Sequence, residues 1–347
     1  MKNTIKKKIR IPLGTFITLF LLLFFWGVVM MIPQENPINA FYQLIKGAFG
    51  SLDRIFSIGN LLFIMIFTAL AYSIPSWTGM YNIGGDGQLV LGGFFAALVP
   101  LYIHTDIKVI NISLTLGIAA LFGGLWALWP AILKVKFNIN EIVTTLLSNY
   151  IIIFFSEYLV NYPFRSPGAT LVARMEYIPL SFQLPHIGNS MLSSSVPIVL
   201  IFLSFVEVFR RFFVYGFQFK VTGSNVLFAL QGGINVNAIK TWSMFIGGAF
   251  AGLAGGLIVL AMNYTFTAGF SAGFGYTGLL IALIARELPL LILMISIIFG
   301  SLQIGAINMQ VFTKIPPEIT GVLQSIIVFF VAAHKTIGNI SVKRKMS

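Results

Sequence analysis

The chain has no cysteine, and charged residues make up only 9% of its 347 residues, while 57% are hydrophobic. The missing cysteine excludes disulfides, thiolate metal sites, cysteine nucleophiles and iron–sulfur clusters. A soluble globular protein carries about 25% charged residues, so a water-soluble fold of this length could not cover its surface. The scarcity of charge therefore excludes a cytosolic or secreted enzyme and a disordered chain, and it leaves a polytopic membrane protein.

Catalytic and nucleotide-binding motifs are missing as well. The three histidines, His104, His186 and His334, are far apart, and none forms a pair with metal-ligand spacing. The sequence has no Gly-x-x-x-x-Gly-Lys-Ser/Thr phosphate loop. If ATP powers transport, the ATPase must be a separate polypeptide. We therefore expect neither enzymatic activity nor a bound cofactor in this chain, although an intramembrane enzyme that uses paired aspartates stays an alternative.

Ten apolar segments are candidates for membrane spans, because a helix needs about 20 apolar residues to cross a roughly 30 Å hydrocarbon layer. They lie near residues 12–32, 57–74, 88–103, 112–133, 142–160, 196–215, 241–262, 277–285, 289–312 and 319–333. The first has an apolar run too long for a signal peptide, so we interpret it as a retained anchor. We predict an all-α integral membrane protein with about ten transmembrane segments, forming a single transmembrane domain over residues 1–347.

The basic residues predict how the chain is oriented. The net charge is +12, and if the N-terminus lies inside, sixteen of the 22 Lys and Arg fall in internal loops. Cytoplasmic loops carry such an excess of Lys and Arg, so we predict that both termini are inside. Because the basic residues are spread over short loops between apolar runs, they favour membrane topology over nucleic-acid binding.

Four stretches depart from a plain series of spans. The proline-rich segment 163–195 is predicted to be an irregular external loop and a docking surface, and 216–240 to be a cytosolic loop. The glycine-rich segments near 75–88 and 263–288 predict broken or re-entrant chain. The nine residues 277–285 would make a helix of only about 14 Å, roughly half the bilayer. Broken backbone at that depth is tolerated only where it is buried in protein or lines a cavity.

The first polar motif is Asn82-Ile83-Gly84-Gly85-Asp86-Gly87-Gln88, between two apolar segments. A charge at the bilayer centre costs about 2.5–3.5 kcal/mol, so Asp86 must reach an interface or face a polar cavity. One interpretation is that Asp86 N-caps the helix that begins near Gln88. The other is that Asn82, Asp86 and Gln88 line a polar substrate path, and one residue can do both.

A second polar motif begins the segment at 142–160. Asn140 is placed to N-cap this helix, and Glu141 suits its N-terminus electrostatically. Glu141, Thr145 and Asn149 follow one another at spacings of four, so they share one helical face. In lipid a polar face must turn toward protein or water. It either forms hydrogen bonds between helices or faces a pore.

The cytosolic loop contains an apolar run, Val226-Leu227-Phe228-Ala229-Leu230. Ser224 and Asn225 can cap a short helix there, and Gly232 or Gly233 can end it. An exposed apolar helix usually docks on a partner. The alternative is an amphipathic helix on the membrane surface.

Gly248, Gly252 and Gly256 recur at a spacing of four within segment 241–262. Small residues at this spacing let two helices approach closely, so this stripe is interpreted as packing, within the chain or against a partner subunit.

In this order the motifs resemble the membrane subunit of bacterial ABC importers, in the branch that handles nucleosides and simple sugars, which is more distantly related to ribose and branched-chain amino-acid permeases. Residues 82–88 are similar to the family pattern Asn-Ile-Gly-x-Glu-Gly-Gln, with Asp86 in place of Glu. Asn140 to Tyr150 are similar to Asn-Glu-x-x-x-Thr-x-x-x-Asn-Tyr. The family's cytosolic motif is matched at Gly216, Lys220, Gly223, Asn225, Ala229, Gly233 and Ile234, without the arginines common in the family.

The resemblance implies a permease subunit in a bacterial cytoplasmic membrane that carries nucleosides, either purine or broad-range. An extracytoplasmic substrate-binding protein would deliver the substrate. Two cytosolic ABC ATPase domains would bind ATP and grip the 216–236 loops of two permease subunits, the second subunit being non-identical. It would contact membrane lipid and no nucleic acid. The implied substrate path comprises Asn82, Asp86, Gln88, Glu141, Thr145 and Asn149. The implied ATPase-coupling residues are Lys220, Gly223, Ser224, Asn225, Phe228, Ala229 and Gly233.

The main alternative is an ion-coupled secondary transporter of a small polar solute, with helices broken at the midplane. Such a protein would use Asp86 or Glu141 as a proton or sodium site. The cytosolic loop discriminates between the two hypotheses, because a secondary transporter needs no surface on which an ATPase docks.

Overall fold

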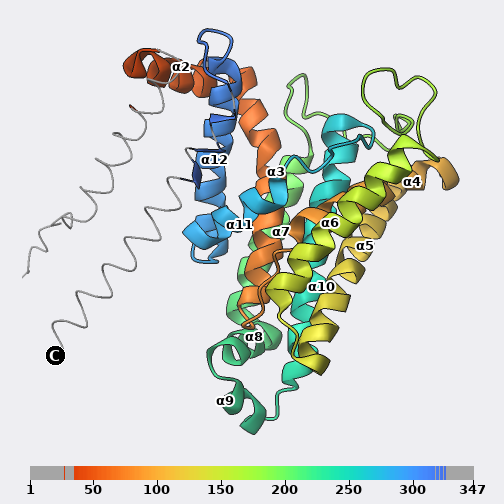
Figure 1. Cartoon of the computed structure of the whole chain (residues 1–347), viewed down its shortest axis with the longest axis vertical. Coiled ribbons are helices and arrows are strands. Elements are labelled where there is room, and N and C mark those ends of the chain that lie inside the picture. Colours follow the sequence, from red (N-terminus) through yellow and green to blue (C-terminus); the bar gives the residue numbers. More distant parts are fainter. Residues whose placement is uncertain (1–26, 28–34, 317, 320, 323, 326–347) are drawn as a thin grey trace, which may run out of the picture. The chain divides into compact units, whose positions relative to one another are not determined.

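The computed structural model describes residues 27, 35–316, 318, 319, 321, 322, 324 and 325. These residues form helices joined by irregular segments (Figure 1), and the described part has no β-strand, only two isolated β-bridges. The chain divides into two compact units, residues 55–300 and residues 1–54 with 301–347. Whether both belong to the one transmembrane domain predicted for residues 1–347 stays a prediction.

Eight of the ten predicted segments are helical, and the other two, 12–32 and 319–333, lie largely outside the described residues. Both ends of the chain also lie outside the described residues, so their placement on the inner side of the membrane stays a prediction. Among the described helices, five are long and apolar enough to cross a membrane: α3, α5, α6, α10 together with η1, and α12. The elements are α2 (Pro37–Phe49), α3 (Leu52–Ser76), α4 (Gly85–Tyr102), α5 (Lys108–Phe137), α6 (Glu141–Asn161), α7 (Ser195–Phe212), α8 (Val214–Ser224), α9 (Val226–Gln231), α10 (Val236–Ile258), the π-helical turn η1 (Val259–Asn263), α11 (Phe274–Ile284) and α12 (Pro289–Met309).

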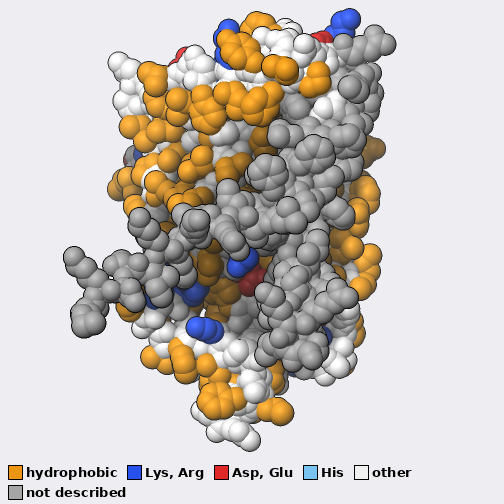
Figure 2. Space-filling view, turned by 90° about the vertical axis from the view of Figure 1, so that its left-hand side faces the viewer, with side chains coloured by type: hydrophobic (Ala, Val, Ile, Leu, Met, Phe, Trp, Pro, Cys, Tyr) orange, Lys and Arg blue, Asp and Glu red, His pale blue; other side chains and the backbone are white. Residues whose placement is uncertain are grey.

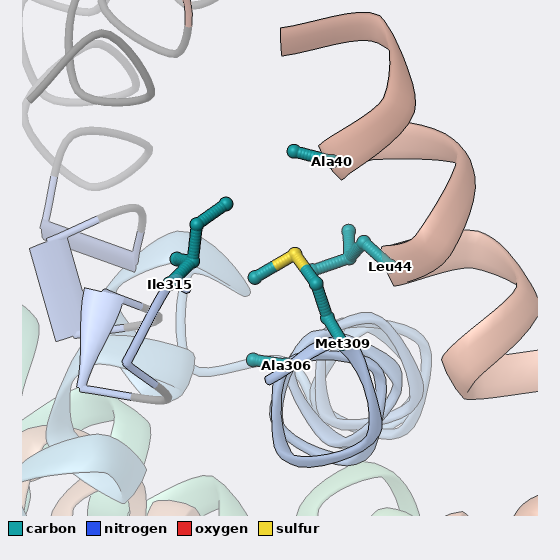
Figure 3. Close-up of a cluster of buried hydrophobic side chains, with 5 residues drawn as sticks. All are labelled: Ala40, Leu44, Ala306, Met309 and Ile315. Carbon is teal, nitrogen blue, oxygen red and sulfur yellow. The ribbon is translucent and has the colours of Figure 1, made fainter. Parts of the chain in front are cut away.

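The smaller unit contains α2, which hydropathy did not predict because its 13 residues are too few for a span. Asn36 caps this helix by accepting a hydrogen bond from the backbone N–H of Ile38 at 2.9 Å. Figure 3 shows that Leu44 of α2 points toward Met309, which ends α12. Ala40, Ala306 and Ile315 complete this buried cluster, which holds α2 and the end of α12 together.

In the larger unit, α10 lies against both α4 and α5 (Figure 1). The contact with α5 is so close that a Cβ on Gly252 would collide with the backbone oxygen of Ala119. A Cβ on Gly123 would lie 2.7 Å from the Cα of Gly252. The stripe of Gly248, Gly252 and Gly256 therefore packs within the chain, as small residues do between membrane helices.

Both predicted breaks are present in the backbone. The chain leaves the helical conformation after α3 and resumes it at α4, and it does so again from residue 264 to 273, between η1 and α11. Positive φ angles at Tyr264, Gly269, Ala272 and Gly273 turn the second break. The short α11 is thus a separate helix rather than part of a longer span.

Segment 163–195 contains no helix before Ser195, as predicted, and it lies along the second break. The N–H of Met175 donates to the carbonyl oxygen of Phe266, and the N–H of Ile178 donates to that of Tyr264, at 2.9 and 2.8 Å. In the opposite direction, the N–H of Ala268 donates to the carbonyl oxygen of Ala173 at 2.9 Å. These bonds satisfy backbone groups that the break leaves without helical partners. That the segment lies outside the membrane stays a prediction.

The described surface is largely apolar. On the face shown in Figure 2, hydrophobic side chains are widespread and charged ones are few. The outward face of α6 is an example, because Leu147, Ile151, Phe154 and Tyr158 are each at least half exposed. Patches of this kind suit contact with lipid or with another membrane subunit.

Candidate functional site

The polar groups of the 82–88 motif are buried and paired with one another. The side-chain amides of Asn82 and Gln88 exchange two hydrogen bonds, each of 2.9 Å. Asn82 also donates to the carbonyl oxygen of Ala71 at 3.1 Å. Pro75 has no N–H to offer that carbonyl four residues before it, so Asn82 supplies the partner that the helix lacks. Asn82 thus satisfies a backbone carbonyl group near the end of α3 and also bonds to Gln88 in the first turns of α4.

Asp86 does not cap its own helix, so that interpretation is wrong. The N-cap of α4 is Gly84, and no side chain caps it. The carboxylate of Asp86 accepts from the N–H of Gly275 at 2.8 Å and from the hydroxyl of Ser271 at 2.9 Å. Gly275 lies in the first turn of α11, so Asp86 caps a neighbouring helix that is distant in sequence.

This geometry explains how a carboxylate can stay buried. Asp86 is only 3% exposed, and no Lys or Arg of the described residues forms an ion pair with it. It lies in the first turn of α4 and accepts from the first turn of α11. Helix N-termini carry partial positive charge, so two of them stabilise one carboxylate in place of a basic side chain.

Thr145 and Asn149 join this cluster from α6. The N–H of Ile83 donates to the Thr145 hydroxyl at 3.2 Å. Asn149 donates to the carbonyl oxygen of Ile83 at 2.9 Å and accepts from the N–H of Gly87 at 2.8 Å. The polar face of α6 therefore forms hydrogen bonds with the first break, as one of the two interpretations expected.

Glu141 is the exception among the six predicted path residues. Its carboxylate forms an ion pair with Lys134 of α5 at 3.0 Å and is buried. Asn140 caps α6 as predicted, accepting from the N–H of Ile142 at 2.9 Å. The structure thus brings together five of the six residues, and Glu141 joins α5 to α6 instead.

Sequence reasoning did not assign site roles to the residues that complete the cluster, Ser271 of the second break and Gly275 and Tyr276 of α11. It also missed Lys134, the partner of Glu141 at the end of α5. Tyr276 receives a hydrogen bond from Asn149 at 3.3 Å. The glycine-rich stretch was the available signal for the first three, since it predicted broken backbone that would need polar partners. In this structure the cluster is closed, because Asn82, Gln88, Thr145 and Asn149 are at most 2% exposed.

The short helix predicted within segment 216–240 is α9. Asn225 caps it by accepting from the N–H of Phe228 at 3.0 Å, whereas the Ser224 hydroxyl bonds back to Val221. Gly233 adopts a positive φ of 75° and ends the helix, with Ile234 donating to the carbonyl oxygen of Ala229 at 3.0 Å.

The apolar side of α9 is exposed. Leu227 and Phe228 are 72% and 61% exposed, while Ala229 is fully buried. Lys220 is exposed on α8, the helix before it. Gly223, in contrast, is packed against the first break, because a Cβ on Gly223 would collide with the backbone oxygen of Trp77. The end of α8 therefore packs on the segment that leads into the polar cluster.

Comparison with known proteins now identifies the family. Residues 54–332 match the family model described as "Branched-chain amino acid transport system / permease component". The chain belongs to this family. Its members are ABC transporter permeases, which are not enzymes, so this permease is a membrane subunit of a transport system. With its apolar helices, it is a multi-pass membrane protein.

Several curated relatives match almost the whole permease. The guanosine ABC transporter permease NupP of Bacillus subtilis is 27% identical over 322 residues, which are 90% of each chain. The nucleoside ABC transporter permease NupB of Lactococcus lactis is 27% identical over 339 residues, 95% of this chain and 92% of NupB. The glucose ABC transporter permease TsgB13 of Haloferax volcanii is 25% identical over 320 residues, 88% and 82% of the two chains. A further guanosine permease of Bacillus subtilis, NupQ, is 25% identical over 263 residues, 73% and 82%. No solved structure matches.

Replacing Asp86 tests whether it caps α11. In Asp86→Ala the buried N–H of Gly275 loses its acceptor, and an unsatisfied buried donor costs about 1–3 kcal/mol. We expect a lower melting temperature of the purified permease and faster amide hydrogen exchange in residues 271–277. Asp86→Asn, which keeps one acceptor oxygen, should show a smaller change in both. Unchanged exchange of this segment in Asp86→Ala would contradict the assignment.

Proposed function

We propose that this permease imports nucleosides across a bacterial cytoplasmic membrane, as a subunit of an ABC importer driven by separate ATPase subunits. The observation that carries the substrate class is the match to permeases named for guanosine and nucleosides over about nine tenths of both chains. The glucose permease among the relatives makes a sugar the alternative outcome of the test.

The exposed apolar side of α9 supports the proposed site for the ATPase. This six-residue helix is capped at both ends, and it exposes four hydrophobic side chains, those of Val226, Leu227, Phe228 and Leu230. A partner with an apolar groove would bury Leu227 and Phe228. Lys220, Ser224, Asn225, Ala229 and Gly233 then serve to position α9. Gly223 packs α8 on the first break instead of facing the partner.

We propose that a second, non-identical permease completes the pathway and that a substrate-binding protein docks on segment 163–195 from outside. Two guanosine permeases of one organism, NupP and NupQ, both match this chain, which supports a paired arrangement. Segment 163–195 suits docking, because Leu171 is 98% exposed and Tyr177 is 58% exposed. Membrane lipid would cover the remaining apolar surface, and we expect no contact with nucleic acid.

The buried polar cluster supports a substrate path that is closed in this conformation. Asn82, Gln88, Thr145 and Asn149 offer amide and hydroxyl groups of the kind that bind ribose hydroxyls and base edges. Here these groups bind one another and the broken backbone. Opening would have to exchange those bonds for bonds to substrate or water. Asp86 would hold α11 in place at the edge of the path, and Glu141 would lie at the far end of the α6 face.

The role of α9 predicts the effect of a charge at its tip. Phe228→Asp should abolish copurification of the ATPase subunits and abolish uptake, because a buried unpaired carboxylate opposes docking. The folded permease should still reach the membrane in normal amount, since Phe228 is exposed. Leu171→Asp is the matched control, because it places the same charge on an exposed position of another loop and should leave ATPase binding intact. Normal ATPase binding by Phe228→Asp would refute the docking site.

The lack of cysteine allows the path to be probed with a single thiol. Thr145→Cys should resist a membrane-impermeant thiol reagent at rest, because position 145 is fully buried. We expect labelling to begin when the assembled importer hydrolyses ATP and to slow when nucleoside is added. Thr115→Cys is the control, since Thr115 is equally buried but bonds only to its own helix, at Asn111. A Thr145→Cys variant that stays unlabelled during turnover would place the path elsewhere.

The substrate class is tested by competition uptake. Cells with the permease and its partners should take up labelled guanosine, and unlabelled purine nucleosides should compete. Pentoses, glucose and free nucleobases should compete weakly, and cells without the permease should show only background uptake. Competition by glucose with none by nucleosides would replace the nucleoside assignment with a sugar.

A further inference from the structure

A cavity of about 710 Å³ lies between α5 and α7, apart from the polar cluster. Its walls are Leu116 and Ala120 of α5, Ile198 and Phe202 of α7, and Leu253 and Leu257 of α10. Val109 and Phe202 are 71% and 37% exposed, so the cavity opens to the outer surface of the bundle. An apolar cleft that opens sideways from a membrane helix adjoins hydrocarbon rather than water.

Three of the α5 residues that line the cavity are small, and they stand among the larger Val109, Ile112 and Leu116. Ser113, Gly117 and Ala120 follow at spacings of four and three and so share one face. A Cβ built on Gly117 would meet no heavy atom of the described residues within 4 Å. The contrast is Gly124 on the same helix, where a Cβ would lie 2.7 Å from the ring of Phe245. Because Gly117 has no side chain, a space is left beside α5, and no side chain of the described residues fills it.

The cavity has the length of one leaflet. Along α5 it runs from Val109 to Ala120, eleven steps of about 1.5 Å, which is roughly 16 Å. This is about half of a hydrocarbon layer of roughly 30 Å. A partner helix that crosses the membrane would need a groove along its full length, whereas a single acyl chain needs only this depth.

The cavity is apolar apart from two hydroxyl groups. Two serines are among its lining residues, Ser113 of α5 and Ser194, whose N–H donates to the carbonyl oxygen of Pro185 in segment 163–195 at 3.0 Å. The Ser194 hydroxyl is buried and has no hydrogen-bond partner among the described residues. Deeper, the rings of Phe67 and Phe202 meet edge-on at 5.7 Å, and both contact Phe250. An acyl chain would contact the exposed part of the Phe202 ring, and its ester end would lie near Ser113 and Ser194.

We propose that this cavity between α5 and α7 binds one acyl chain of a phospholipid, with the ester end at Ser194 and the chain end at Phe67. The proposal requires only a membrane-embedded chain, so it stands independently of the transported substrate and of the ATPase contact. The lipid would fill a space that otherwise leaves α5 and α7 without contact along one leaflet.

A photoreactive lipid tests the site. The full-length permease would be reconstituted in phosphatidylethanolamine and phosphatidylglycerol vesicles that contain a phosphatidylethanolamine with a diazirine midway along one acyl chain. After irradiation, peptide mapping should find label on Ile198 and Leu253, which line the cavity and are partly exposed. Gly117→Leu fills the cavity without a backbone clash and should abolish this label while leaving the label on exposed Phe154 unchanged. Ser113→Leu, a second filling variant, should act in the same way.

Leu121→Phe is the control variant, because it adds bulk on the outward face of the same helix at a position that does not line the cavity. It should leave the label on Ile198 and Leu253 unchanged. Two results would overturn the proposal: no label at these two residues in the unaltered permease, or equal label in both filling variants.

Discussion

Hydrocarbon offers no hydrogen bonds, so each backbone group that a broken helix frees inside a membrane needs a partner from the protein. The described part of this chain breaks twice, after α3 and before α11, and the same few side chains bond to both breaks. Asn82 bonds to the carbonyl oxygen that Pro75 leaves without a partner, Asn149 bonds to the backbone of the first break, and Asp86 caps α11. Polar residues that resemble a substrate site are therefore also the residues that hold the bundle together.

That double role connects segment 163–195 to α8 through a series of contacts. Segment 163–195 is hydrogen-bonded to the second break, and the second break ends at the carboxylate of Asp86. From Asp86 the chain runs back through the first break to Trp77, against which Gly223 packs at the end of α8. Contact alone does not show coupling, which needs an element with two stable arrangements. The two breaks are the natural candidates, because their hydrogen bonds join separate helices instead of closing within one.

How far the sequence predicted this arrangement depends on the range of the interaction. Asn140 and Asn225 cap helices that begin at the next residue, and such local bonds follow from residue type and spacing. The cap interpretation of Asp86 was wrong because its partner N–H belongs to Gly275, 189 residues away. Lys134 and Glu141 are seven residues apart but lie on different helices, so their ion pair depends on how α5 and α6 turn toward each other. Hydropathy predicts which residues form helices, but it does not predict which faces of those helices pack against each other.

The glycines of α5 are a second case in which sequence does not predict which helix faces meet. Gly123 and Gly117 are alike in sequence terms, each a glycine in an apolar helix. Gly123 lets α10 approach to backbone contact, whereas Gly117 faces open space. Small residues allow two helices to pack closely only where a second helix is present. Where none is present, they leave a cleft with apolar walls. Water forms no hydrogen bonds with such walls, so another apolar molecule must fill the cleft. In a membrane the nearest such molecule is lipid, so one helix can combine a protein-packing face with a lipid-binding face, built from the same kind of residue.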